Sequence, residues 1–167
     1  MRKGMCEMNN RDSDVFSETD NRFRLRLPKP EDMEIWRRFD RHLPAELFKQ
    51  KVLEKMAWLI CREDIPVGVL RWGLFWDTIP FLNLIYLDSS CRRNGLGRWA
   101  MGCWEKEMRR QGYPLVMVST QVDEEAQHFY RKLGYRDIGA ITMDFPGFEQ
   151  PLEMFLAKDL RKESNTE

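Results

Sequence analysis

Residues that bind metals or cross-link chains are scarce in this sequence. Its 167 residues include four cysteines and two histidines, and no Cys-x-x-Cys pair occurs. Such a set suggests neither a metal-ligand cluster nor a disulfide framework. Cys61 and Cys103 lie in apolar stretches and are expected to pack in the core. We therefore predict a protein without a metal, in a reducing, cytoplasmic compartment.

Long apolar runs and an excess of charge are also lacking. No run is long enough to span a membrane, and the N-terminus lacks the apolar segment of a secretory signal. The 27 basic and 27 acidic residues cancel, and the pI is about 6.8. A neutral chain has no broad electrostatic attraction to nucleic acid. Neither a membrane nor a nucleic acid is therefore expected as a partner.

Polar ends enclose a body with enough apolar sequence for a core. Residues 1–22 are polar and mixed in charge, and we interpret them as a flexible N-terminal tail. Residues 161–167 form a second polar tail, and residues 23–160 are expected to fold as a single domain.

The body alternates between strand-like and helix-like patterns. Prolines at positions 30 and 44 are expected to open two helices, and Gly134 to end a third. Apolar runs and turn residues predict strands at 23–27, 57–61, 67–75, 81–87, 115–119, 135–145 and 152–157. The helix that Gly134 ends is predicted at 123–133, and a fourth helix at 98–111. The predicted class is α/β (mixed α+β), with antiparallel hairpins at both ends and one strand–helix–strand crossover in the middle.

The helix predicted at 98–111 is amphipathic. Its apolar stripe consists of Leu96, Trp99, Ala100, Cys103 and Trp104. The other face carries Arg98, Glu105 and Arg109, and the stripe is expected to reach solvent near Glu107.

A glycine turn, Arg92-Arg93-Asn94-Gly95-Leu96-Gly97, precedes this helix and follows the apolar strand 81–87. A helix start has free backbone N–H groups and a positive dipole end, and both favour an anion. Glycines let a backbone approach a phosphate closely. The turn therefore predicts a phosphate site, although a strand-to-helix turn that merely needs small residues stays an alternative.

Three phosphate-binding motifs can be compared with this turn. The nucleoside-triphosphate P-loop is absent. The dinucleotide fingerprint fits residues 95–100, but the next strand ends Val118-Ser119-Thr120 without an acidic residue for a ribose. The third motif, [Gln/Arg]-x-x-Gly-x-[Gly/Ala], is met by Arg92, Gly95 and Gly97, and such turns wrap the pyrophosphate of coenzyme A.

A second segment, residues 123–135, lies one strand downstream. Together with the glycine turn it resembles the GCN5-related N-acetyltransferase (GNAT) family over roughly residues 23–160. Family members carry Asn-x-x-Ala-x-x-Phe-Tyr-x-x-x-Gly-Phe/Tyr, and here the matching residues are Ala126, Phe129, Tyr130, Gly134 and Tyr135. Asp123 stands where Asn is usual, and it should still cap the helix.

The resemblance implies a GNAT-like fold with a mostly antiparallel sheet of six to seven strands and about four helices. It also implies that acetyl-CoA lies between strands 81–87 and 115–119, which splay apart. The backbone near Leu87 would bind the pantetheine arm and polarise the thioester carbonyl, and Tyr130 would protonate the departing thiolate. The implied cofactor-binding residues are Leu87, Arg92, Arg93, Asn94, Gly95, Leu96, Gly97, Arg98, Asp123 and Tyr130.

The general base and the acceptor are less well defined. Strand 81–87 contains no acid or histidine, so Asn83 and Tyr86 could only position water. Candidate bases are His42, Glu46 and Asp77, alongside a water chain or direct capture of a neutral amine.

The segment 39–48 contains Asp40, His42, Glu46 and Phe48, and it could accept a cationic amine with an apolar body. Phe75 and Trp76 either pack in the core or line the acceptor pocket.

The leading interpretation is an N-acetyltransferase that moves an acetyl group from acetyl-CoA to a primary amine of a small molecule or peptide, by direct attack in a ternary complex. One alternative is a catalytically impaired coenzyme A-binding sensor, and another is a nicotinamide-dinucleotide binder. By family analogy, a homodimer that pairs the final strands stays open.

Overall fold

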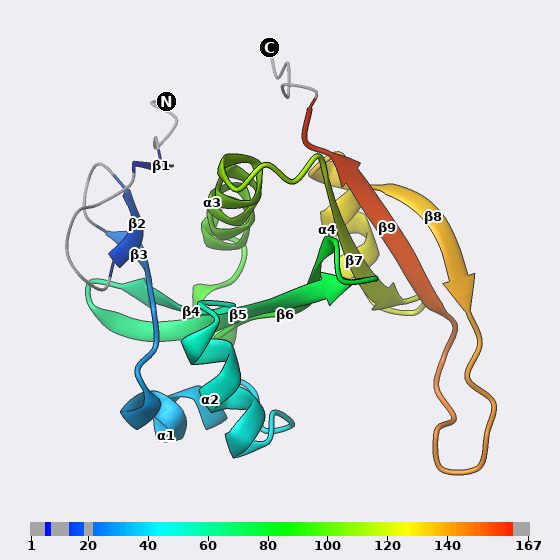
Figure 1. Ribbon diagram of the computed structural model, residues 1–167, viewed down its shortest axis with the longest axis horizontal. Helices are drawn as coiled ribbons and strands as arrows, with labels where there is room; N and C mark the ends of the chain where they lie inside the picture. The colour runs from blue at the N-terminus through cyan, green and yellow to red at the C-terminus, as the bar shows by residue number, and fades with distance from the viewer. Residues whose placement is uncertain (1–5, 8–13, 19–21, 162–167) are drawn as a thin grey trace. The chain divides into compact units, whose positions relative to one another are not determined.

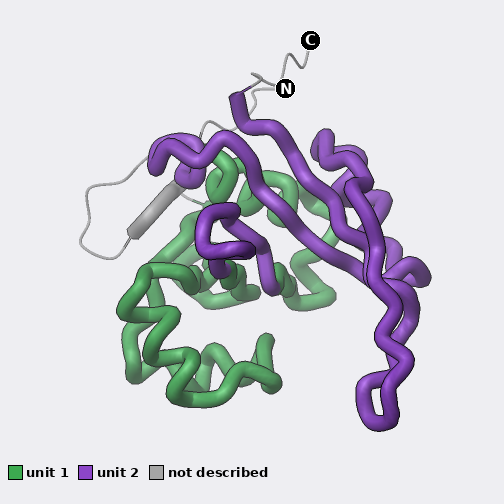
Figure 2. Tube along the Cα trace, turned by 45° about the vertical axis from the view of Figure 1, so that its right-hand side comes forward, with its two compact units in different colours: residues 1–72, 84–106 green, residues 73–83, 107–167 purple. Residues whose placement is uncertain are grey.

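The computed structural model describes residues 6–7, 14–18 and 22–161. The chain divides into two compact units (Figure 2). Unit 1 comprises Met1–Trp72 and Leu84–Lys106, and unit 2 comprises Gly73–Asn83 and Glu107–Glu167. The boundaries fall inside three continuous elements, which are β5 (Ile65–Phe75), β6 (Ile79–Leu87) and α3 (Leu96–Arg110).

Unit 1 contains an antiparallel run of strands. Its order is β1 (Cys6–Glu7), β2 (Asp14–Glu18), β3 (Phe23–Arg26), β4 (Ala57–Arg62) and β5, and each strand is antiparallel to the next. The β4–β5 hairpin turns at Glu63 and Asp64, which have φ angles of 48° and 69°. This confirms the hairpin predicted around that turn. The sequence did not predict β1 and β2; the remainder of the predicted tail, residues 1–22, lies largely outside the described residues.

The first helices of unit 1 start at the predicted prolines. Pro30 opens the 3₁₀ turn η1 (Pro30–Asp32), which continues into α1 (Met33–Arg37), and Pro44 precedes α2 (Ala45–Leu53). The first helix was expected to run to about His42 but ends at Arg37. A carboxylate oxygen of Asp40 accepts the backbone N–H of His42 at 3.3 Å, and such side-chain bonds compete with helix continuation.

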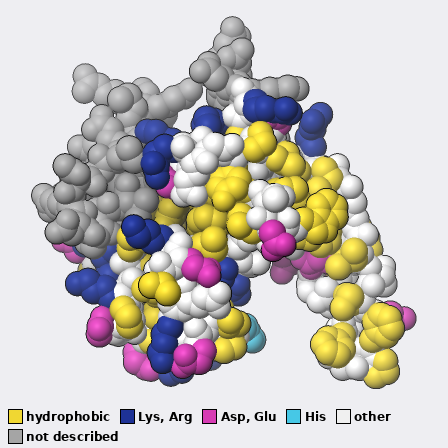
Figure 3. Space-filling view, in the orientation of Figure 1, with side chains coloured by type: hydrophobic (Ala, Val, Ile, Leu, Met, Phe, Trp, Pro, Cys, Tyr) yellow, Lys and Arg dark blue, Asp and Glu magenta, His cyan; other side chains and the backbone are white. Residues whose placement is uncertain are grey.

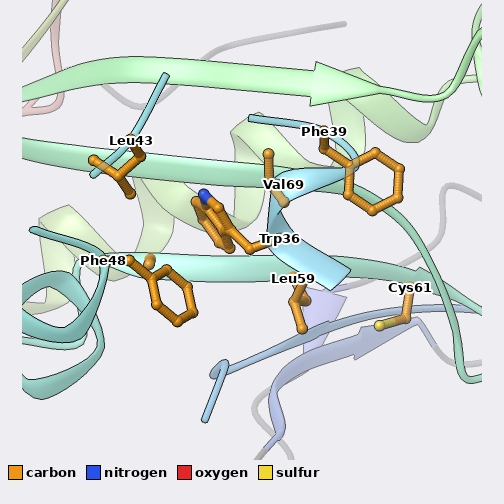
Figure 4. Packing of buried hydrophobic residues seen from close by; sticks show 8 residues of the cluster. Trp36, Phe39, Leu43, Phe48, Leu59, Cys61 and Val69 are labelled. Atoms are coloured by element: carbon orange, nitrogen blue, oxygen red, sulfur yellow. The ribbon is translucent and has the colours of Figure 1, made fainter. Parts of the chain in front are cut away.

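The core of unit 1 packs these helices onto the sheet. The rings of Trp36 in α1 and Phe48 in α2 lie 5.3 Å apart, and both side chains are fully buried (Figure 4). The cluster is completed by Phe39, Leu43, Ala57, Leu59, Cys61 and Val69. Large aromatic side chains dominate such a core because each removes the most apolar surface from water.

Helix α3 starts two residues before its predicted start, at Leu96. Leu96, Ala100, Cys103 and Trp104 are fully buried, as predicted from the stripe, and so are Met101 and Met108.

Two predictions about the acids of α3 are wrong. Glu105 was expected to face outward, and Glu107 was expected near solvent, yet both are buried. Arg110 donates two hydrogen bonds of 2.7 Å to the Glu107 carboxylate, which compensates the buried charge.

Unit 2 holds the remaining strands in the order β6, β7 (Leu115–Gln121), β9 (Glu153–Asp159) and β8 (Arg136–Ile141). β6 and β7 are parallel, as the predicted crossover requires, and β9 is antiparallel to both of its neighbours (Figure 1). Helix α4 (Ala126–Lys132) connects β7 to β8. The strands from β3 to β9 and the helices α1 to α4 confirm the predicted mixed, mostly antiparallel fold.

The loop between β8 and β9 is apolar. Strand β8 ends at Ile141, earlier than the predicted position 145. Yellow side chains gather at this end of the hairpin (Figure 3), where Phe145 and Phe148 are 65% and 67% exposed.

Candidate active site

The glycine turn adopts a conformation that few residues tolerate. Arg93 and Gly95 have φ angles of 62° and 91°, in the left-handed region. A Cβ atom on Gly95 would meet no described atom within 4 Å, so the requirement for glycine is conformational rather than steric. The Asn94 side-chain oxygen accepts the Leu96 N–H at 3.2 Å. Residues 92–95 are exposed, whereas Leu96 is buried and anchors the helix start.

The start of α3 suits a diphosphate. The Trp99 N–H donates to the Gly95 carbonyl at 2.9 Å. The N–H groups of Gly97 and Arg98 come before this bond and have no carbonyl partner in the helix, so they are available to an anion. Arg92, Arg93 and Arg98 are all exposed around the same turn. Backbone donors, a positive helix end and guanidinium groups are the partners that a pyrophosphate prefers. The residues present therefore fit the phosphate portion of coenzyme A.

The structure brings Arg92 and Leu87 together at the end of β6. Arg92 Nε donates a hydrogen bond to the Leu87 carbonyl at 2.9 Å, and its guanidinium lies 5.1 Å from the centre of the Tyr86 ring. Nearby, β5 approaches this end of β6 without room for a side chain. A Cβ atom on Gly68 would overlap the Tyr86 carbonyl and lie 2.7 Å from Leu87 Cδ2. The position of Leu87 is thus fixed from two directions.

Parallel pairing between β6 and β7 is short. Phe81 pairs with Met117 and Leu82 with Val118, and among the described residues the pairing ends there. Asn83, the next residue, is exposed. The separation of the two strands towards the end of β6 stays a prediction, because residues 84–87 belong to unit 1 and β7 to unit 2.

Tyr130 lies on α4 and is buried, with 6% of its surface exposed. Its ring packs against Phe129 and Tyr135, at centroid distances of 5.4 and 5.7 Å. Burial, together with the negative charge of Glu124, raises the pKa of Tyr130 well above its usual value. The hydroxyl makes no hydrogen bond within the described part of the chain. It is therefore protonated at neutral pH and free to donate.

Asp123 does not cap α4, contrary to the prediction. The helix begins at Ala126, three residues later than expected, and Asp123 lies exposed in the preceding turn. The neighbouring Glu124 is the acid that matters locally, because it accepts the Thr120 hydroxyl at 2.7 Å and faces Tyr130 electrostatically. The only sequence signal for this role is that Glu124 lies just before the start of the helix that carries Tyr130.

The three candidate bases are exposed and lie on different elements. His42 lies in the turn after α1, and Glu46 pairs with Lys49 on the surface of α2 at 2.8 Å. Asp77 follows β5 with a φ angle of 59°.

The aromatic candidates divide between core and surface. Phe48 belongs to the core of unit 1. In unit 2, Phe75 packs against Phe81 and Phe155, while Trp76 is 77% exposed beside it.

The described residues offer neither a metal-ligand group nor a membrane-spanning helix. They contain no group of three or more His, Cys, Asp or Glu side chains able to hold a metal ion. None of the helices in this part of the chain has the length and apolar character needed to cross a bilayer.

The fold and the anion-binding turn are those of an acyltransferase that uses a coenzyme A thioester. The chain belongs to the acetyltransferase (GNAT) family, which matches residues 20–135. It is accordingly an acetyl-CoA-dependent acetyltransferase, and acetyl-CoA is the acetyl donor.

Solved structures share this fold at low sequence identity. An N-acetyltransferase from Staphylococcus aureus Mu50 is 18% identical, with 83% of this chain and 98% of that chain covered and a TM-score of 0.68. Ard1 from Thermoplasma volcanium is also 18% identical, covers 83% and 97%, and has a TM-score of 0.72. Arabidopsis thaliana Naa50, solved with the bisubstrate analogue CoA-Ac-MVNAL, is 14% identical, covers 83% and 99%, and has a TM-score of 0.69. No curated protein matches the chain.

Proposed function

We propose that this protein transfers the acetyl group of acetyl-CoA to a primary amine by direct attack in a ternary complex. The observation that carries the proposal is the turn of residues 92–97 between the end of β6 and the start of α3, which is exposed over residues 92–95 and left-handed at Arg93 and Gly95. The acceptor is proposed to be the amine of a peptide or small molecule. The bisubstrate analogue CoA-Ac-MVNAL in the Naa50 complex supports peptides as the first acceptors to test.

Donor binding is assigned to the turn and to the end of β6. The N–H groups of residues 92–98 would donate to the pyrophosphate, with Arg92, Arg93 and Arg98 adding charge. The edge of β6 at Leu87 would hydrogen-bond the pantetheine arm as an added strand does. When bound, acetyl-CoA supplies an acetyl group activated as a thioester.

Leu87 is proposed to stabilise the reacting carbonyl. Its backbone N–H would polarise the carbonyl and hold the negative charge that develops on the oxygen when the amine attacks. The close approach of Gly68 and the hydrogen bond from Asp88 N–H to the Val67 carbonyl, at 2.8 Å, hold this part of the strand in place. Such preorganised donors cost no reorganisation during the reaction.

Tyr130 is proposed to assist the departing thiolate. A thiol has a pKa of about 8.5 and an ordinary tyrosine about 10, so full proton transfer from tyrosine to thiolate is already uphill. The raised pKa of Tyr130 strengthens that preference. Its main contribution is then a hydrogen bond to the developing negative charge, and the thiolate takes its proton from solvent after coenzyme A leaves.

The acceptor amine must lose a proton before it attacks. Strand β6 offers no carboxylate or imidazole between residues 79 and 87. We assign this step to capture of the neutral amine or to a water, with His42, Glu46 and Asp77 as the side-chain bases to test.

The test is acetyl-CoA turnover with a panel of amines, peptide N-termini included. Tyr130→Phe should lower kcat about 10- to 100-fold, the effect of one hydrogen bond to a charged group, while the KM for acetyl-CoA stays the same. Tyr113→Phe is the matched control, because Tyr113 lies in the turn after α3 and has no assigned role. Equal kcat values for the two variants would remove Tyr130 from the reaction.

The second candidate is a coenzyme A-binding sensor without catalysis. The absence of an acid or histidine from the β6 sequence favours it. A sensor would bind acetyl-CoA as tightly as an enzyme does and acetylate no amine in the panel.

A further inference from the structure

The acidic side chains of the proposed acceptor segment are already compensated. Asp40, 3% exposed, accepts Arg71 Nε at 2.7 Å, Trp36 Nε1 at 3.3 Å and the His42 N–H at 3.3 Å. Glu46 pairs with Lys49 on the surface. Since Asp40 is buried with its own cation, it cannot offer charge to a substrate. It acts instead as a positioning residue that ties the turn after α1 to β5.

Two aromatic rings, those of the buried Phe39 in this turn and the exposed Tyr86 in β6, connect two arginines. The Arg38 guanidinium lies 5.5 Å from the centre of the Phe39 ring, which is 6.3 Å from the Tyr86 ring. The Arg92 guanidinium lies 5.1 Å from the centre of the Tyr86 ring, on the other member of this ring pair. These four residues, here called the arginine–aromatic array, form a continuous run from α1 to the glycine turn. All of them belong to unit 1.

Arg38 of the array is free to bind an anion of the acceptor, whereas Arg92 is already assigned to the donor pyrophosphate. Arg38 and Arg92 are exposed, and neither forms an ion pair within the described part of the chain. Arg38 differs in this from its neighbour Arg37, whose guanidinium pairs with Glu34 at 2.9 Å. An uncompensated guanidinium over an aromatic ring is a favourable partner for a carboxylate.

The array also reaches the proposed reaction centre. Arg92 Nε is bonded to the carbonyl of Leu87, the residue whose N–H is proposed to hold the thioester oxygen. An amine that attacks there therefore approaches the exposed Tyr86 ring and positive charge. This step rests on the proposed function.

We propose that the array selects acceptors that carry a carboxylate close to the amine, with Arg38 binding the carboxylate. Two kinds of molecule have this chemistry: free amino acids, through the α-carboxylate, and peptides with an acidic residue after the N-terminal amine. Polyamines and lysine-rich peptides are disfavoured, since they bring positive charge to Arg38. This reverses the acceptor expected from the sequence, which was a cationic amine.

The experiment compares peptides identical except for Glu, Gln or Lys at the second position, and glycine against glycinamide. The full chain should show kcat/KM at least about tenfold higher for the Glu peptide than for the Lys peptide, or for glycine than for glycinamide, since one charge-assisted hydrogen bond is worth a factor of about 10 or more. The arm that responds identifies the source of the carboxylate. In Arg38→Gln, the kcat/KM values of the paired substrates should differ by no more than about threefold. Arg38→Lys should restore part of the preference, and the control Arg37→Gln should retain all of it.

Three results would overturn the inference. Equal rates for the Glu and Lys peptides and for glycine and glycinamide, or faster acetylation of the Lys peptide, would show that the array does not select anions. A raised acetyl-CoA KM in Arg38→Gln with an unchanged acceptor preference would assign Arg38 to the donor instead. Binding of acetyl-CoA without turnover of any acceptor would remove the proposed function, and this inference with it.

Discussion

Tyr130 shows how the surroundings of one side chain decide its chemistry. Burial among Phe129 and Tyr135 holds its hydroxyl in the protonated form, and the charge of Glu124 adds to this effect. A raised acid pKa means that the donor form persists as the pH increases. The residue can therefore donate a hydrogen bond over the whole range in which an acceptor amine becomes neutral.

This protonation state gives the first prediction. The ratio of kcat for the unmodified protein to kcat for Tyr130→Phe should stay constant from pH 7 to pH 10, because Tyr130 keeps its proton there. The ratio cancels the titration of the acceptor amine and of other groups. The measurement is a pair of pH–rate profiles with one acceptor. A ratio that falls through about pH 10, the ordinary tyrosine pKa, would contradict the assignment.

At the scale of elements, an ion pair joins β3 to η1. Arg26 donates to both carboxylate oxygens of Asp32, at 2.7 and 3.1 Å, and the Lys29 N–H donates to the same side chain at 2.7 Å. Burial opposes ionisation of Asp32, but the Arg26 and Lys29 hydrogen bonds outweigh it and lower the pKa below its ordinary value of 3.8. The connection after β3 is thereby fixed at the point where α1 begins.

The second prediction concerns the pH dependence of this link. A lowered pKa contributes stability that is present above the ordinary pKa and lost as the pH falls through the folded-state pKa. Asp32→Asn should therefore lower the free energy of unfolding by about 1 kcal/mol at pH 7 and make little difference well below pH 3. Urea unfolding of both proteins between pH 7 and pH 2 measures this. A difference that is independent of pH would show that the charge of Asp32 does not matter.

The third prediction concerns the close approach of β5 to β6. Gly68→Ala should displace the end of β6, because the added methyl group would overlap the Tyr86 carbonyl. The expected result is a lower melting temperature and a higher KM for acetyl-CoA. Gly102→Ala is the control: an added Cβ there meets no described atom within 4 Å, and alanine in a helix should stabilise the protein by about 0.5–1 kcal/mol. If both substitutions changed the KM for acetyl-CoA equally, Gly68 would have no particular role in donor binding.

Much of this arrangement follows from local sequence, and the exceptions have physical causes. Prolines 30 and 44, the Glu63-Asp64 turn and Gly134 marked element ends correctly, because each acts on its own backbone. Asp40 was misjudged because its buried charge is neutralised by Arg71, which is distant in the sequence. Glu107 was misjudged because Arg110, three residues later in the same helix, neutralises it and lets it be buried. β1 has only two residues, and β2 reads Asp-Val-Phe-Ser-Glu without the alternation that indicated β3.

At the scale of the whole molecule, the donor should stabilise the folded state. A ligand that binds only the native form adds about 2.7 kcal/mol at a hundred times its Kd. We predict that saturating acetyl-CoA raises the melting temperature by several degrees, while NADH at the same concentration does not. Thermal unfolding in the presence of each ligand tests this. If NADH alone raised the melting temperature, the glycine turn would be a dinucleotide-binding turn, which its glycine spacing also fits.

The position of β9 between β7 and β8 has a consequence for synthesis. β9 is the last strand among the described residues, yet it pairs with β7 over residues 115–121 and with β8 on its other side. In a nascent chain, β7, α4 and β8 therefore leave the ribosome before the strand that joins them. Unit 2 cannot complete its sheet until residues 153–159 have emerged. A stop codon shortly before Glu153 would leave two unmated strand edges, which is the kind of surface that aggregates and that cellular proteases remove.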